Sequence, residues 1–111
     1  MRYYYIDEIA PADLKRITKH LQAQGMQGSL EGIYWLEIPY HLLTEEQAAH
    51  FQDCGPYVVT LECGSEWINL ELLVRGRNQL RCSCIAYTAP EQRAYAIETL
   101  DSILKKLDIP T

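Results

Sequence analysis

The chain has 111 residues, four cysteines and a formal net charge of -5. A chain of this length forms a single domain over residues 1–111, and it can bury a core large enough to fold without disulfides. Hydrophobic residues make up 48% of the sequence and charges of both signs are mixed, which excludes an intrinsically disordered class. The acidic balance also argues against nucleic-acid binding, because that function needs a clustered basic surface.

The start of the chain and its apolar runs exclude two further classes. Asp7 and Glu8 stand where a secretory signal peptide has its apolar core. No apolar run reaches the roughly 20 residues that a membrane-spanning helix needs. The sequence therefore predicts a cytoplasmic protein that has no membrane partner. Its cysteines are expected to be reduced thiols rather than a disulfide framework.

The first part of the chain predicts a strand followed by an amphipathic helix. Residues 2–6 are rich in aromatic and β-branched side chains, which favour a strand. Pro11 is well suited to the first turn of a helix, and Gly25 to the position just after its end. Apolar residues recur between them at helical spacing, at Leu14, Ile17 and Leu21.

A second strand and a short helix follow. Residues 33–38 predict the strand, which Pro39 ends because proline cannot donate to a ladder. Thr44 and Gln47 have the spacing of a capping box, in which each side chain bonds to the other residue's backbone. This helix is expected to continue to about Cys54, where Gly-Pro follows.

Residues 57–87 predict an antiparallel meander, because side chains on a strand alternate between its two faces and apolar residues follow that period here. Its three strands are 57–63, 67–75 and 80–87. The pair Gly64-Ser65 predicts a two-residue type II′ turn between the first two strands. One face of the meander is apolar throughout and the other is mixed, as expected when one side of a sheet packs on a core.

A final helix begins at Pro90 and completes the fold. Its apolar stripe is the strongest helical signal in the chain and consists of Ile97, Leu100, Ile103, Leu104 and Leu107. The elements predict an α+β two-layer sandwich with an antiparallel sheet of about five strands and two main helices on one face. The element order resembles the TATA-binding-protein-like and helix-grip folds with one short helix inserted. This resemblance concerns order alone and implies no function.

The mixed face of the meander predicts an interface. It carries aromatic, aliphatic and arginine side chains, types that are enriched at interface centres: Trp67, Leu73, Arg75, Arg81, Ile85 and Tyr87. A solvated face with scattered apolar residues accounts for the same pattern. Because two-fold dimers are the commonest oligomers, the leading hypothesis is a non-enzymatic interaction module that self-associates as a homodimer.

The alternative hypothesis is a small-molecule or zinc-binding protein. His50 and Cys54 are four residues apart on one helix, which places their Cβ atoms about 5–6 Å apart. Cys82 and Cys84 share one face of a predicted strand, about 6.7 Å apart. Together they provide a Cys3His set for tetrahedral zinc, provided that helix and strand meet. Core packing is the favoured interpretation of the cysteines, because free cysteine behaves as a small hydrophobe and the C-x-C spacing departs from C-x2-C.

The sequence fixes no catalytic group. No P-loop, Rossmann, nucleophile-elbow or zincin motif is present. Glu62 and Glu71 fall on the mixed face of neighbouring strands, where cross-strand pairing with arginine is the simpler role. Enzymatic activity is therefore not expected from one chain, although an enzyme subunit whose site forms across an oligomer stays open as a third hypothesis.

Overall fold

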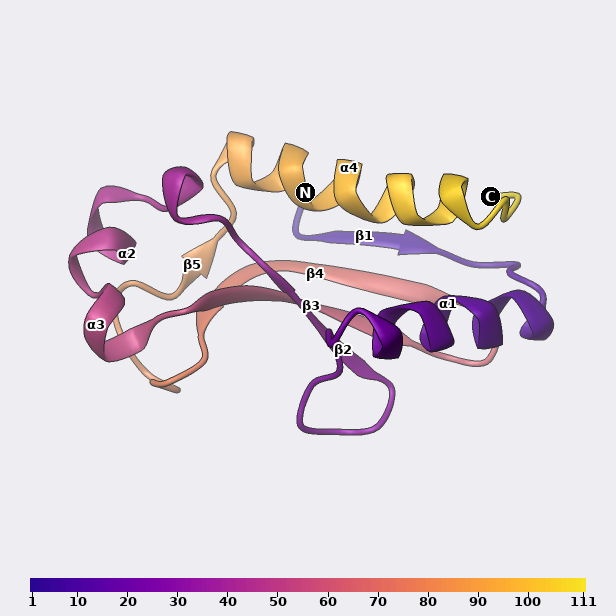
Figure 1. Ribbon diagram of the computed structural model, residues 1–111. Coiled ribbons are helices and arrows are strands. Elements are labelled where there is room, and N and C mark those ends of the chain that lie inside the picture. Colours follow the sequence, from indigo (N-terminus) through magenta and orange to yellow (C-terminus); the bar gives the residue numbers. More distant parts are fainter.

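The computed structural model describes residues 1–111 and has one antiparallel sheet with helices on one of its faces (Figure 1). The strands are β1 (Tyr3–Ile6), β2 (Ile33–Glu37), β3 (Tyr57–Cys63), β4 (Ile68–Gly76) and β5 (Ala86–Tyr87). The helices are α1 (Pro11–Ala23), α2 (Glu45–Ala49), α3 (Phe51–Cys54) and α4 (Pro90–Lys106), with a 3₁₀ turn at Tyr40–Leu42. The spatial order is β1-β4-β3-β2, and β5 pairs with the far part of β4. The predicted α+β class is confirmed.

The core lies between one face of the sheet and the two long helices. Alternate residues of β4 are completely buried, whereas those between them are not. The helices contribute Leu14, Ile17 and Leu21 from α1 and Ala96, Leu100 and Leu104 from α4. Each fully buried leucine or isoleucine contributes about 1.5–3 kcal/mol of transfer free energy. The other face of the sheet is uncovered, and none of the helices is long and apolar enough to cross a membrane.

Polar contacts attach the helices to their neighbours. The hydroxyl of Tyr4 donates to Asp101 Oδ1 at 2.7 Å, which ties α4 to β1. The guanidinium of Arg16 donates to the carbonyl of Leu107, which joins α1 to the end of α4. Gly25 has a φ of 71° and ends α1, as its position predicts.

The capping box at α2 is confirmed, but the helix it opens is shorter than the sequence suggests. Thr44 Oγ1 accepts from the Gln47 backbone N–H at 3.2 Å, and the Thr44 N–H donates to Gln47 Oε1 at 3.0 Å. His50 then adopts φ -96° and ψ 7°, outside the helical region, and divides the predicted helix into α2 and α3. His50 therefore lies between α2 and α3, and Cys54 lies at the end of α3, rather than both on one face of a continuous helix.

The third predicted strand is wrong over residues 80–85. Residues 77–85 form a loop, and only β5 pairs with β4. β1 pairs with Ile68 to Glu71, and the backbone of Leu72 bonds to Arg2 and Thr88, so a further strand finds a free edge of β4 only from Leu73 onward. β5 pairs with Leu73 and Val74. Beyond β4 the chain is held toward α3 instead, because the N–H groups of Arg77 and Asn78 donate to the carbonyls of Pro56 and Cys54. Within the loop, a turn bond from the Ile85 N–H to the Cys82 carbonyl replaces the ladder.

The turn between β3 and β4 is centred one residue later than predicted. The Gly64 N–H donates to the Trp67 carbonyl at 2.8 Å, so Ser65 and Glu66 form the centre of the turn. Gly64 is not among the glycines with positive φ, which excludes the type II′ geometry. Residue 64 is glycine for a steric reason, because a Cβ at this position would collide with the indole of Trp67.

Candidate metal centre

Four side chains with metal-ligating atoms meet at the end of the sheet where β3 begins and β4 ends. His50 lies between α2 and α3, Cys54 ends α3, and Cys82 and Cys84 lie in the loop of residues 77–85, all at the left of Figure 1. Their ligand atoms all lie within 4.8 Å of one another. These are the four residues of the zinc hypothesis, brought together by segments almost 30 positions apart in sequence.

Backbone contacts between the two segments hold the cluster together. The Arg77 N–H donates to the Pro56 carbonyl at 2.9 Å, and the Asn78 N–H donates to the Cys54 carbonyl at 3.1 Å. Gly76 allows this approach, because a Cβ on it would come 2.5 Å from the Cys54 carbonyl oxygen. The pairing of β3 with β4 thus positions the loop against the end of α3.

A buried polar network lies beneath the cluster. Gln47 and Gln92 are each 1% exposed, and the Gln92 amide donates to Gln47 Oε1 at 2.8 Å. The Gln47 amide in turn donates to the Cys84 carbonyl at 3.2 Å. The hydroxyl of Tyr57 donates to the Gln47 carbonyl at 2.9 Å and lies 3.4 Å from Cys84 Sγ. The network therefore connects the N-terminal parts of α2 and α4 to a cysteine of the cluster.

Most of this network does not follow from the sequence. The spacing of residues 44–47 predicts a capping-box role for Gln47, but it indicates no role for Gln92 or for the Tyr57 hydroxyl. The available signal was a glutamine three residues after the N-cap, a position whose side chain bonds back to the N-cap backbone: Gln92 Oε1 accepts from the Ala89 N–H at 2.9 Å. Every buried side-chain nitrogen and oxygen in the structure has a partner, which is the condition for such a network to stabilise the fold.

Cys82 has the electrostatic environment of a thiolate. The Cys84 backbone N–H points at Cys82 Sγ over 3.5 Å, and His50 Nδ1 lies 3.0 Å from the same sulfur. Hydrogen bonds from the Cys84 backbone and side chain and from His50 lower the pKa of Cys82 to about 6. The bond to Cys82 in turn raises the pKa of His50. In the absence of a cation, the pair favours thiolate and imidazolium.

The other two thiols of the cluster are buried and favour the neutral form. Cys54 is 3% exposed and Cys84 is 2% exposed. Burial raises the pKa of Cys54 to about 12 and raises that of Cys84 as well. A divalent cation bound between the sulfurs would reverse this preference, because a coordinating thiol is deprotonated by the charge of the metal.

The donor set and its spacing fit a single tetrahedral zinc ion. Zn–S bonds of about 2.3 Å separate the sulfurs of a tetrahedral site by about 3.8 Å. The observed spread of up to 4.8 Å closes to that value through side-chain adjustments of about 1 Å. The fourth cysteine, Cys63, lies at the opposite end of β3 and is not part of the cluster.

Comparison of the chain with protein-family models, with curated proteins and with solved structures finds no match. The interpretation of the cluster therefore depends on its own geometry and chemistry.

The open face of the sheet holds four of the six residues of the interface hypothesis, namely Trp67, Leu73, Arg75 and Tyr87. Trp67 stacks on Tyr5 from β1, with ring centroids 5.8 Å apart. The Arg2 guanidinium lies 4.1 Å from the centroid of the Tyr87 ring. The surface is therefore rich in aromatic rings that no helix covers.

The other two interface residues lie elsewhere. Arg81 and Ile85 belong to the loop of residues 77–85, so their assignment to a strand face was wrong for the reason given for that strand. Arg77, which sequence reasoning placed only in a turn, extends over the open face, with its guanidinium 4.4 Å from the centroid of the Trp35 ring. Arg77 thus joins the residues of this surface.

Proposed function

We propose that this protein binds one zinc ion through His50, Cys54, Cys82 and Cys84, and that the ion is structural. The observation that carries the proposal is the convergence of three sulfurs and one imidazole nitrogen within 4.8 Å from two distant segments. Four protein ligands fill a tetrahedral shell and leave no open position for substrate or water, which is the mark of a structural site.

The role of the ion is to order the loop of residues 77–85. This loop has a single turn bond of its own and ends in a strand of only two residues. Zinc bonds to Cys82 and Cys84 join it to α2 and α3. A ligand that binds only the folded state stabilises it by about 4 kcal/mol when its free concentration is 1,000 times Kd, so the ion contributes substantially to a domain of this size.

The chemistry of the ligands supports zinc and a reducing compartment. Thiolates and imidazole prefer borderline-soft metals, and a closed tetrahedral arrangement of three sulfurs and one nitrogen is a usual zinc set. The thiols must stay reduced to bind, so we place the protein in the cytoplasm.

Native mass spectrometry of protein purified without chelator, beside its denatured mass, tests the proposal. We expect one added zinc mass that is lost on denaturation. Cys84→Ser and His50→Ala should each lose it, whereas Cys63→Ser, a cysteine outside the cluster, should retain it. A folded wild-type protein at its bare chain mass, which gains no metal when zinc is supplied, would overturn the proposal.

Self-association is a second proposed function, and the exposed aromatic rings of the open sheet face favour it. Tyr3, Tyr5 and Tyr87 are 52%, 54% and 46% exposed on one surface. Exposed aromatic side chains beside arginine are typical of interaction sites. The expected partner is a second copy, and the mass of the protein in solution tests this proposal independently of its zinc content.

A further inference from the structure

The two ends of the open sheet face carry opposite charges. Residues 75–81 contain three arginines and no carboxylate, in a chain whose net charge is -5. We call this stretch the basic segment. At the other end, the acidic hollow is a depression of about 560 Å³ lined by Tyr5, Asp7, Glu8, Glu66 and Trp67 among others. The three carboxylates of the hollow have no ion-pair partner within the chain, and neither do Arg77 and Arg81.

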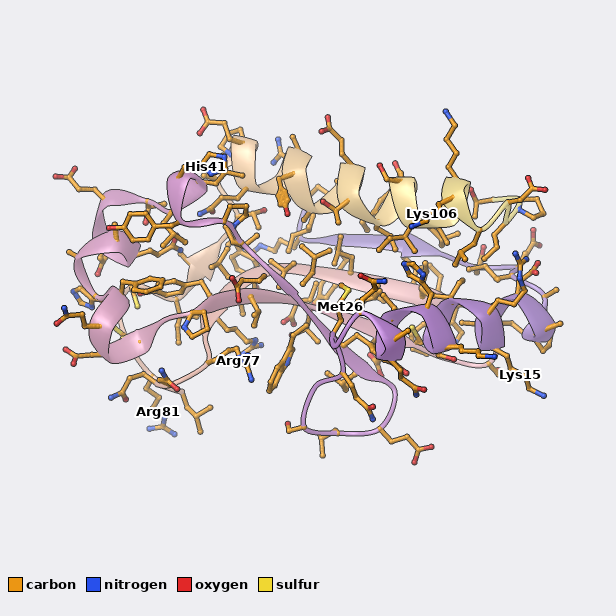
Figure 2. All side chains as sticks on the ribbon, in the orientation of Figure 1. Lys15, Met26, His41, Arg77, Arg81 and Lys106 are labelled. Carbon is orange, nitrogen blue, oxygen red and sulfur yellow. The ribbon has the colours of Figure 1, made fainter.

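Strand β4 separates these two features along its length. Glu66 and Trp67 directly precede β4, and Arg77 directly follows it. Since Ile6 pairs with Ile68, Asp7 and Glu8 emerge from β1 at the end where β4 starts. The nine residues of β4 span about 30 Å. The backbone of the basic segment and the acidic hollow thus lie at opposite ends of β4. Figure 2 shows Arg81 near α3 and Arg77 farther inward, where its guanidinium lies over the Trp35 ring.

The surface between the two ends combines aromatic rings with polar side chains, among them Asn69 and the ion pair of Glu71 with Arg75. Tyr3, Tyr5 and Tyr87 are each about half exposed there, and Leu73 pairs with Tyr87 beside them. In the basic segment, Leu80 is 90% exposed between Arg77 and Arg81. This is the most exposed large apolar side chain of the molecule, and backbone bonds to Cys54 and Pro56 fix the start of its loop.

We propose that the open face docks on the open face of a second copy, with the basic segment of each copy against the acidic hollow of the other. The two-fold axis runs between the two sheets and across β4, so that the β4 strands are antiparallel. Both charge contacts then form at once and the assembly is closed. Leu80 of each copy meets the rings of Tyr5 and Trp67 in the hollow.

Charge complementarity favours a second copy in this antiparallel orientation as the partner. A parallel stack of the same faces would place basic segment on basic segment and hollow on hollow, an arrangement that like charges disfavour. An anionic membrane is disfavoured because the rest of the chain is strongly acidic and would be repelled by the lipid headgroups. The inference rests on the proposed self-association and is independent of the zinc proposal.

A charge exchange between two variants tests the arrangement. The first variant carries Arg77→Glu and Arg81→Glu, and the second carries Asp7→Lys and Glu66→Lys. In the antiparallel dimer, each variant alone meets like charges at both contacts, whereas the mixture meets opposite charges at both. We expect wild-type dimers, a Kd at least about tenfold higher for each variant alone, and recovery to within about threefold in the mixture.

Native mass spectrometry measures the populations of monomers and dimers. It distinguishes heterodimers from both homodimers by mass, and the same spectra report the zinc content. A control variant, Lys19→Glu with Lys106→Glu, makes the same charge change as the first variant but on exposed positions of α1 and α4, and it should keep the wild-type Kd.

Three outcomes would contradict the inference in different ways. A wild-type monomer at about 100 µM would remove both the arrangement and the proposed self-association, and would leave the zinc proposal intact. A dimer whose Kd neither variant changes would keep self-association and remove the arrangement. Variants that both lose the dimer and do not recover it on mixing would show that these charges do not face one another.

Discussion

Replacing Gln47 by alanine should destabilise the protein more than any other loss of a single polar side chain. Gln47 is 1% exposed and bonds to three different parts of the chain. Its oxygen accepts from Gln92 and from the Thr44 N–H, and its nitrogen donates to the Cys84 carbonyl. Water can replace the bond to Thr44, which is exposed, but the other two partners are buried.

The magnitude follows from the two groups left without a partner. One N–H of Gln92 and the Cys84 carbonyl each lose their bond inside the protein, at about 1–3 kcal/mol per buried orphaned group. The sum is about 4 kcal/mol, a large fraction of the 5–15 kcal/mol that stabilises a typical domain. Because Gln47 also orients the backbone of Cys84, zinc affinity should fall by about 10–100-fold.

Urea unfolding of the zinc-bound protein measures this effect. With a slope of about 2 kcal/mol per molar urea, the midpoint of Gln47→Ala should fall by about 2 M. Gln47→Met, which retains most of the volume, should lose nearly as much if hydrogen bonding is the cause. The control is Gln52→Ala on the exposed side of α3, which should stay within about 0.5 kcal/mol of wild type. A Gln47→Ala protein as stable as this control would refute the reasoning.

Three further predictions concern the cluster itself. In the metal-free protein at neutral pH, Cys82 should be the first cysteine alkylated by iodoacetamide, because its lowered pKa keeps the thiol ionised. The alkylation rate of Cys82 should fall to half its maximum near pH 6. Equal rates at all four cysteines would contradict this prediction. Zinc binding near pH 7 should release about two to three protons, because the pKa values of Cys54 and Cys84 are raised and the metal must displace their protons. Zinc affinity should therefore weaken as pH falls. Calorimetry in buffers of different ionisation enthalpy measures the number of protons released, and a value near zero would oppose ligation by three thiolates. Gly76→Ala should weaken zinc binding in a competition with a chromophoric chelator, because its Cβ displaces the Cys54 carbonyl, whereas an alanine at Gly28, a glycine remote from the cluster, should leave affinity unchanged.

The sequence was sufficient for the layers of the fold and insufficient for the path of the cysteine loop. Alternation along β3 and β4 and the stripes of α1 and α4 are local patterns, and local patterns specify which side faces the core. Residues 80–85 have the same alternation, yet they form a loop, because bonds from Arg77 and Asn78 to Pro56 and Cys54 hold the chain toward α3. Those bonds join segments far apart in sequence, so no local pattern contains them.

The candidate site was predictable as a set of residue types but not as a place. His50, Cys54, Cys82 and Cys84 were visible as two pairs, and only the pairing of β3 with β4 determines that the pairs meet. The partners of Cys84 were hidden for another reason. A glutamine near a helix start is ordinary in sequence, and its burial in a network depends on how α2 and α4 pack together.

The position of the cluster has a consequence for how the hairpin of β3 and β4 can open. A hairpin ordinarily frays from the end opposite its turn, where nothing joins the strands. Here the turn at Gly64 joins one end, and at the other end the loop bonds back to Cys54 and Pro56 beside the cluster. Neither end of the two central strands is therefore free to separate first. Amide hydrogen exchange should be equally slow at both ends of the hairpin, and local unfolding should begin at the outer strands β1 and β2.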